Sequence, residues 1–180
     1  MNDRNAMIIA YLEDPDFQNS LNPMAARMGI TTGIDCDALP GAIGDFGRCL
    51  ETPIPVNGAL GQVTYLSKLR TSADSRLLFH RLGSKSGPYG FVDLFEVLSF
   101  DGQIHETLYL DFYHPRRSSL APSGYYLSDE ISFITGDHIG YPDFPNGYRE
   151  ITFENAVGRG VDFAYEDPDF IEQVVAKIKR

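Results

Sequence analysis

The middle third of the chain carries the clearest pattern of apolar and polar positions. Val63, Tyr65 and Leu69 occupy alternate positions of one run. A polar turn over residues 71–75 separates this run from a second one over residues 76–82. Alternation with a period of two on both sides of a turn predicts a β-hairpin.

A second hairpin is predicted a little further along the chain. Residues 91–100 are nearly all apolar, and they lead into Asp101-Gly102. This dipeptide is typical of a two-residue hairpin turn in which both residues have positive φ. Residues 104–113 then return as the partner strand. We expect the four strands of the two hairpins to pair in an antiparallel sheet.

Helices are predicted at both ends of the chain. Residues 5–12 read as a short helix, and the pentapeptide Glu-Asp-Pro-Asp-Phe occurs at residues 13–17 and again at 166–170. Aspartate followed by proline starts a helix well, because the carboxylate caps free N–H groups and proline has none to satisfy. After the second copy, apolar residues continue at helical spacing as far as Ile178. We interpret the two copies as two similar helix starts rather than an internal repeat.

The remaining segments complete the expected fold. Residues 29–60 are rich in Gly, Pro, Thr and Asp and show no regular pattern. Residues 125–134 and 148–154 are predicted to add edge strands. We therefore expect a single α+β domain over residues 1–180, with a mainly antiparallel sheet of four to six strands and helices from both termini packed on it.

Composition and charge narrow the range of partners. The 180 residues are 43% hydrophobic and carry a formal net charge of −10, and the hydrophobic share is that of an ordinary globular chain. Residues 1–60 contribute −5, residues 61–120 contribute +1 and residues 121–180 contribute −6. Nucleic acid is disfavoured as a direct ligand, because phosphates attract Lys and Arg. A basic protein partner fits better, although the acidic surface could also serve solubility alone, and the oligomeric state stays open.

Two further features of the sequence indicate the cellular compartment of the protein. No apolar run approaches the ~18 residues that span a membrane, and residues 1–4 lack the basic and apolar regions of a signal peptide. Cys36 and Cys49 form no CxxC pair. One disulfide between them is possible, but the missing export signal favours reduced thiols in a cytosol. These observations predict a cytoplasmic protein without a membrane partner.

No established catalytic or metal-binding motif is present. The histidines His80, His105, His114 and His138 lack the spacing of metal ligands. The glycines and serines form no phosphate-binding loop or nucleophile elbow. We therefore assign no catalytic residue, no metal and no cofactor, and expect His80 to be a satisfied core or rim residue.

The densest polar cluster follows the last predicted strand of the second hairpin. His114, Arg116 and Arg117 could bind a phosphate or carboxylate there. Alternatively, the arginines could tie the loop to acids such as Glu96 or Asp111. We favour the structural role, because the chain is so acidic.

Two groups of residues are candidates for partner binding. Aromatic side chains on loops bury a large area at low entropic cost. This makes Tyr125, Tyr126 and Tyr141 candidates, although the rings could instead cover the sheet. The second group could cap a basic site on another protein or form a solvated helix end. It is acidic and lies near the C-terminus: Asp162, Glu166, Asp167, Asp169 and Glu172.

The middle of the chain also resembles a family of small bacterial proteins. The segments that carry the resemblance are PIPVNG (53–58), YLSKLR (65–70), LFHRLG (78–83), VDLFEV (92–97) and FYHPRRS (112–118). Such proteins are similar to the immunity partners encoded beside polymorphic or contact-dependent toxins. The resemblance implies a binding role and a cytosolic location, and it carries over no catalytic residue.

Two functions of different classes follow. The first is a cytoplasmic immunity-type protein that binds and neutralises a cognate toxin domain by stoichiometric occlusion. The second is a small enzyme that acts on an anionic substrate through His114, Arg116 and Arg117, with Asp111 or Glu96. A structural or regulatory subunit would differ from the first only in its partner.

Overall fold

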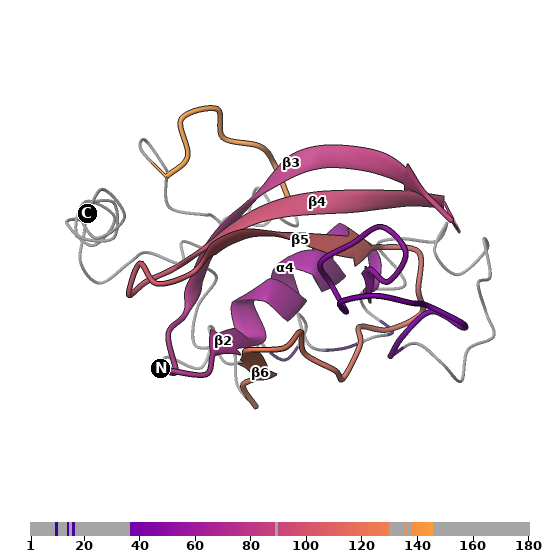
Figure 1. Ribbon diagram of the computed structural model, residues 1–180, viewed down its shortest axis with the longest axis horizontal. Helices are drawn as coiled ribbons and strands as arrows, with labels where there is room; N and C mark the ends of the chain where they lie inside the picture. The colour runs from indigo at the N-terminus through magenta and orange to yellow at the C-terminus, as the bar shows by residue number, and fades with distance from the viewer. Residues whose placement is uncertain are drawn as a thin grey trace.

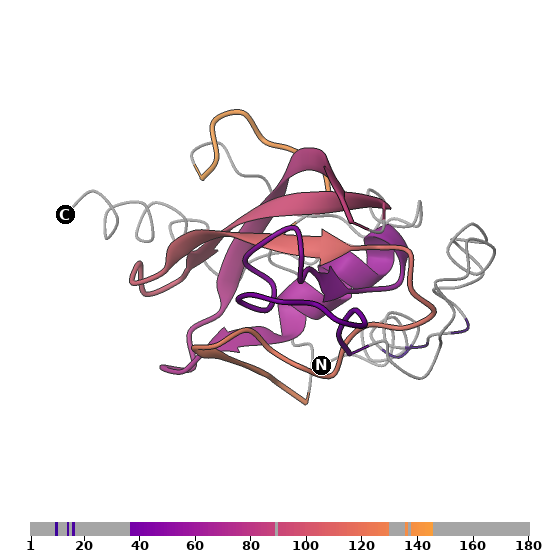
Figure 2. The same cartoon turned by 45° about the vertical axis from the view of Figure 1, so that its right-hand side comes forward.

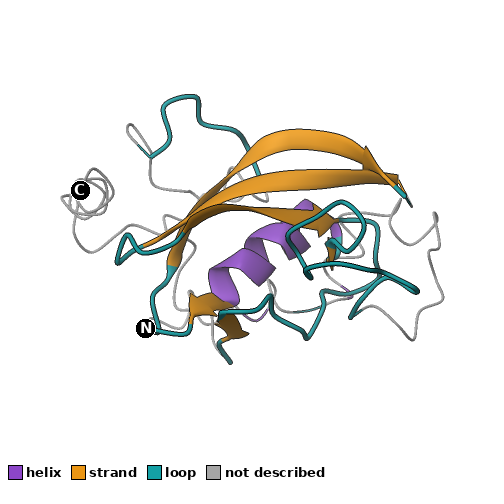
Figure 3. Ribbon diagram, viewed as in Figure 1, coloured by secondary structure: helices purple, strands orange, loops and turns teal. Residues whose placement is uncertain are grey.

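Strands packed on one helix make up the part of the chain that the computed structural model describes (Figures 1 and 3). This part comprises residues 37–88, 90–129, 136 and 138–145, together with Ala10, Asp14 and Asp16.

The central sheet has four strands in the order β1-β5-β4-β3. β3 (Leu77–Gly87) pairs antiparallel with β4 (Gly90–Ser99), and β4 pairs antiparallel with β5 (His105–Asp111). The short β1 (Ile54–Pro55) lies parallel to β5 at the other edge. The expectation of a mainly antiparallel sheet in a mixed α and β fold is therefore confirmed.

A helix and a second, smaller sheet complete the described region. α4 (Gly58–Lys68) follows β1 and runs directly into β2 (Leu69–Thr71). β2 pairs antiparallel with β6 (Tyr125–Leu127) in a separate two-stranded sheet. The edge strand predicted from residue 125 thus exists over three residues, but its partner is β2 rather than the central sheet. Residues 148–154 lie outside the described residues.

The first predicted hairpin is wrong, because residues 61–68 belong to α4 and not to a strand. Nearly every residue of this helix is buried, including the polar Gln62 and Ser67. A helix that is covered on all sides has no exposed polar face, so its sequence need not show the helical period. The turn over residues 71–75 is confirmed, and β3 follows it.

The second predicted hairpin is confirmed as β4 and β5, but its turn differs from the expected one. The loop has four residues, since the Ser99 N–H donates to the Ile104 carbonyl over 2.9 Å. Gly102 has a φ of 70°, whereas Asp101 does not have positive φ. Instead, Oδ1 of Asp101 accepts the backbone N–H of Gln103 over 3.1 Å. Such a side-chain bond two residues on stabilises a turn without left-handed backbone at the aspartate.

The central sheet buries side chains on both faces. Gln62 of α4 bonds Asp93, and side chains alternate along a strand, so Asp93 and Phe95 face the helix. Leu94 and Leu98 lie on the opposite face and are buried as well. Burial on both faces explains why β4 reads as an almost continuous apolar run.

Gly136 and residues 138–145 lie along and over the outer strand β3. Gly136 forms a parallel bridge with Phe79, and the Arg81 N–H donates to the carbonyl of Ile139 over 3.4 Å. Figures 1 and 2 show residues 138–145, in orange, on the side of β3 away from α4. A Cβ atom on Gly136 would come within 2.1 Å of the Phe79 ring, so only glycine fits this contact. The contact covers part of an edge that would otherwise be open to pairing.

Helices from both termini are not supported by the structure. Residues 166–178 lie outside the described residues, and so do residues 5–12 apart from Ala10. The helix that packs on the sheet is α4, from the middle of the chain. Within the described residues, no helix is long and apolar enough to cross a membrane.

Candidate functional site

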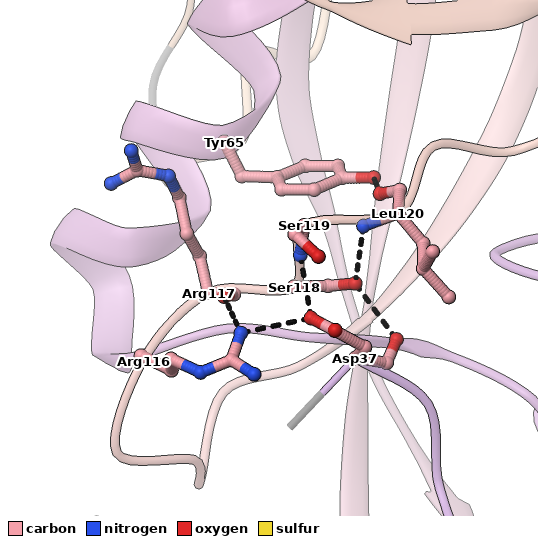
Figure 4. A network of polar contacts seen from close by, with 7 residues as sticks. All are labelled: Asp37, Tyr65, Arg116, Arg117, Ser118, Ser119 and Leu120. Atoms are coloured by element: carbon pink, nitrogen blue, oxygen red, sulfur yellow. Dashed lines mark hydrogen bonds and ion pairs between the residues drawn. The ribbon is translucent and has the colours of Figure 1, made fainter. Parts of the chain in front are cut away.

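Asp37, the first residue of the described segment 37–88, binds the loop that follows β5 (Figure 4). Its Oδ1 accepts Nη1 of Arg116 and the backbone N–H of Ser119, both over 2.8 Å. The hydrogen bond from Arg116 lowers the pKa of the Asp37 carboxyl, although burial acts in the opposite direction. The arginine therefore has the structural role that we favoured, but its partner is Asp37 rather than Glu96 or Asp111.

The same loop is also bound to the helix. Ser118 donates its hydroxyl to the carbonyl of Asp37 over 2.7 Å and accepts the N–H of Leu120 over 3.0 Å. The carbonyl of Leu120 accepts the hydroxyl of Tyr65, a fully buried residue of α4, over 2.6 Å. These bonds hold the loop against the core.

His114 forms a buried pair with Asp111. Both side chains are only 2% exposed, and Nε2 of the histidine lies 3.2 Å from Oδ2 of the aspartate. The two atoms are at ion-pair distance but are not aligned for a hydrogen bond. The other oxygen of Asp111 accepts the backbone N–H of Tyr113 over 3.2 Å. Solvent, and therefore a substrate, does not reach this histidine in the structure.

The three candidate anion-binding residues thus have different surroundings. Nη1 of Arg116 bonds the carboxylate of Asp37 and the carbonyl of Arg117. Figure 4 shows the guanidinium of Arg117 pointing away from this network. His114 is buried beside Asp111, so the three side chains are not gathered on one open surface.

Glu96 on β4 joins two histidines from the neighbouring strands. Its Oε2 lies 2.8 Å from Nε2 of His80, and its Oε1 lies 2.6 Å from Nε2 of His105. Burial raises the pKa of Glu96, but the hydrogen bonds from the two histidines outweigh it and lower the pKa below its usual value. The carboxylate is the shared acceptor of this cluster.

The second ring nitrogen of His80 is engaged as well. Nδ1 accepts the backbone N–H of Tyr141 over 2.9 Å, so the proton of the neutral ring is on Nε2 and is donated to Glu96. Phe144 stacks on the ring, with centroids 4.2 Å apart. The expectation that His80 is a satisfied core residue is confirmed.

Tyr125 of β6 is buried. Its hydroxyl donates to Oε1 of Glu106 over 2.7 Å, and the guanidinium of Arg48 lies 5.6 Å from its ring centre. Arg48 in turn donates from both Nε and Nη2 to the carboxylate of Glu106. These contacts give Tyr125 a structural role in joining β5, β6 and the loop before β1.

The other two candidate tyrosines lie apart from each other. Tyr126 is 42% exposed, and its hydroxyl bonds the carboxylate of Asp74. Tyr141 lies against His80 and covers the face of the sheet away from α4. Tyr126 is therefore the candidate tyrosine most open to a partner.

The acidic candidates near the C-terminus all lie outside the described residues. They are Asp162, Glu166, Asp167, Asp169 and Glu172.

A cavity that the sequence did not indicate lies between α4 and the strand pair β3–β4. Its volume is about 380 Å³. The residues around it come from the helix, from both strands, from the end of β5 and from the segment that covers β3. They are Ala59, Gln62, Arg81, Ser84, Phe91, Asp93, Phe112, Tyr113 and His138.

Asp93 organises the polar side of this cavity. Its Oδ1 accepts Nη2 of Arg81 over 2.8 Å and the hydroxyl of Ser84 over 2.6 Å. Its Oδ2 accepts Nε2 of Gln62 over 2.6 Å. The Asp93 side chain is 11% exposed, and three donors compensate for the water that its carboxylate loses.

Asp93 is the residue through which sequence reasoning could have found the cavity. A carboxylate inside an otherwise apolar strand needs partners when the strand is buried. Gln62 is 31 positions away, on a helix that the pattern predicts as a strand, and Arg81 on β3 is 12 positions away. No local spacing connects them.

Among the residues that the structure describes, no group of three or more His, Cys, Asp or Glu is placed to hold a metal ion. Cys49 forms no disulfide. Comparisons of the chain with protein-family models, curated proteins and solved structures found no match.

Proposed function

We propose that the chain is a cytoplasmic immunity-type protein that neutralises a basic toxin domain by stoichiometric binding. The observation that carries the proposal is the formal net charge of −10, concentrated in the first and last thirds of the sequence. A strongly acidic surface speeds the encounter with a basic protein and excludes acidic competitors.

The folded core does little to offset this charge at the surface. Three arginines are engaged in ion pairs within the fold, and each of them neutralises a carboxylate. The pairs are Arg48–Glu106, Arg81–Asp93 and Arg116–Asp37. Each pair is neutral as a unit, so the net charge of −10 is carried by groups outside these three pairs.

Apolar anchors for a partner are present at the covered edge of the sheet. Leu82 is 51% exposed and Ile139 is 48% exposed. Their segments are joined by the bond from the Arg81 N–H to the Ile139 carbonyl. Protein interfaces combine an apolar centre with a polar rim, so these two side chains suit the centre of a contact.

The enzyme alternative has less support from the described residues. Of the residues through which it would act, His114 is 2% exposed and Arg116 is held by Asp37. Turnover through these groups would require the loop to leave the core, which its bonds to Tyr65 and Asp37 oppose.

The proposal is tested with the product of the neighbouring gene as the partner. We expect the charge reversals Glu166→Lys, Asp169→Lys and Glu172→Lys, combined, to slow association about tenfold or more, and the association of the parent to slow as salt rises. His114→Ala and Arg116→Ala serve as controls and should leave the association rate nearly unchanged. The opposite order of effects would favour the enzyme alternative.

A further inference from the structure

The cavity beside α4 has a rigid polar side whose hydrogen-bonding capacity is only partly used. Its volume of about 380 Å³ lies within the range of small-ligand pockets, roughly 300–1,000 Å³. Gln62 is 1% exposed and Asp93 is 8% exposed, so the helix and the strand hold these groups in place. A fixed set of polar groups beside an open space is what specific binding of a small molecule requires.

We propose that this cavity binds a neutral, flat ligand with an amide edge, meaning a carbonyl oxygen beside an N–H group. Arg81 and Tyr113 donate to the carbonyl oxygen, and Gln62 accepts the N–H. The inference is independent of the protein-binding function proposed above.

The first donor is the guanidinium of Arg81. Its Nη2 donates to Asp93 over 2.8 Å and to Ser84 over 2.5 Å, and these bonds fix the plane of the group. Nε and Nη1 make no hydrogen bond with another described residue. A guanidinium has five N–H donors, so three remain for a ligand.

The second donor is the hydroxyl of Tyr113. Burial raises its pKa, and the negative charges of Asp93 and Asp111 raise it further, against the effect of Arg81. The hydroxyl is therefore protonated near neutral pH and is able to donate. It forms no hydrogen bond with another described residue.

The acceptor is Oε1 of Gln62. A carboxylate only accepts hydrogen bonds, so the atom of Gln62 that contacts Asp93 is the amide nitrogen, at 2.6 Å. This orientation leaves Oε1 without a partner among the described residues, in a side chain that lines the cavity. The cavity thus offers donors and an acceptor together, which matches the edge of an amide.

The charges around the cavity favour a neutral ligand. The two oxygens of Asp93 already accept three hydrogen bonds, so this carboxylate has little capacity left for a cation. An anion is disfavoured, because Asp93 balances the charge of Arg81 and Asp111 adds a negative potential at Tyr113. The net charge of −10 acts in the same direction.

Aromatic walls favour a flat ligand. Phe91 and Phe112 both line the cavity, and Phe91 is 62% exposed. A flat ring packed against these side chains would bury apolar area and gain aromatic contacts.

The test compares four probes of similar size by NMR titration of the full chain. Benzamide has the amide edge outside its ring and uracil has it within the ring, whereas benzoate carries only acceptors and benzamidine only donors. We expect benzamide, uracil or both to bind with a Kd of about 1 mM, as is usual for so few atoms, and at least about tenfold more tightly than the two charged probes. If only one of the two amides binds, the result shows whether the ligand carries its amide edge within a ring or outside it. Preference for benzoate or benzamidine, or no binding by either amide, would overturn the proposal.

Two pairs of variants assign the binding to this cavity. Tyr113→Phe should weaken amide binding by about two- to tenfold, the effect of one lost hydrogen bond. Tyr126→Phe removes a hydroxyl outside the cavity and should leave the affinity unchanged. Phe91→Ala should weaken binding, whereas Ile43→Ala, which truncates an 83% exposed apolar residue elsewhere, should not. Equal effects within each pair would show that the cavity is not the binding site.

Discussion

The backbone N–H of Tyr141 donates to Nδ1 of His80 over 2.9 Å, and this contact fixes which ring nitrogen carries the proton. Nε2 then donates to Glu96, so His80 connects the segment over residues 138–145 to the sheet. The ring is an internal connector and has no nitrogen left to act as a base.

The substitution His80→Ala should destabilise the protein by about 1–3 kcal/mol. It leaves the Tyr141 N–H without its acceptor, and an unsatisfied buried donor costs about that much. His105→Ala is the matched control, because it removes the other partner of Glu96 from a site that is 47% exposed. An exposed pair contributes at most about 1 kcal/mol. Equal losses in urea unfolding would contradict the connecting role of His80.

Glu96 should make stability depend on pH with a definite sign. Its pKa in the folded protein lies below the reference value of 4.5. A carboxyl with a lowered pKa adds stability above its unfolded pKa, and this contribution is lost as the pH falls through the folded value. The difference in free energy of unfolding between the parent and Glu96→Gln should therefore be largest above about pH 5 and shrink toward about pH 3. A difference that stays constant over this range would show that the histidines do not stabilise the charged form.

The turn between β4 and β5 requires left-handed backbone at Gly102, where φ is 70°. Gly102→Val should cost about 1–2 kcal/mol or more, because a side chain with a branched Cβ strains this conformation. Gly102→Asn is the control, since asparagine adopts left-handed backbone more readily, and it should cost less. Equal melting temperatures for the parent and the valine variant would contradict the turn.

The ion pair between Asp37 and Arg116 should contribute only modestly to stability. Both side chains are more than one third exposed, and such pairs contribute about 0.2–1 kcal/mol. A double-mutant cycle with Asp37→Asn and Arg116→Gln measures the coupling by urea unfolding. A coupling energy well above this range would contradict the prediction. It would mean that other contacts of the loop are lost together with the ion pair.

The parts of the fold that were predictable depend on contacts between near neighbours in sequence. β4 and β5 are joined by a short loop with glycine at a left-handed position, so the hairpin was predictable, although Asp101 does not have the positive φ that was expected. α4 was missed because its polar residues are buried against partners, Gln62 on Asp93 for example, and the helix has no exposed face to mark its period. A buried helix and a strand then look alike in sequence.

The polar sites, too, were predictable only where the partners are near neighbours in sequence. Arg116 was expected to form a structural tie, but its partner Asp37 lies 79 positions away in sequence, in a segment without regular pattern. The cavity likewise combines Gln62, Arg81 and Tyr113, which come together only after the helix packs on the sheet. Sequence identifies the residue types that need partners, whereas the fold decides which partners they meet.

The measurement that tests the central claim most directly is a titration of toxin activity. The proposed partner, a basic toxin domain that the neighbouring gene would encode, is held at a fixed amount and mixed with increasing amounts of the protein, and the remaining toxin activity is measured. Stoichiometric occlusion predicts a linear loss of activity that reaches zero at one equivalent, with a complex of both chains in size-exclusion chromatography. Complete protection far below one equivalent, increasing with time, would mean catalytic turnover and would contradict the account.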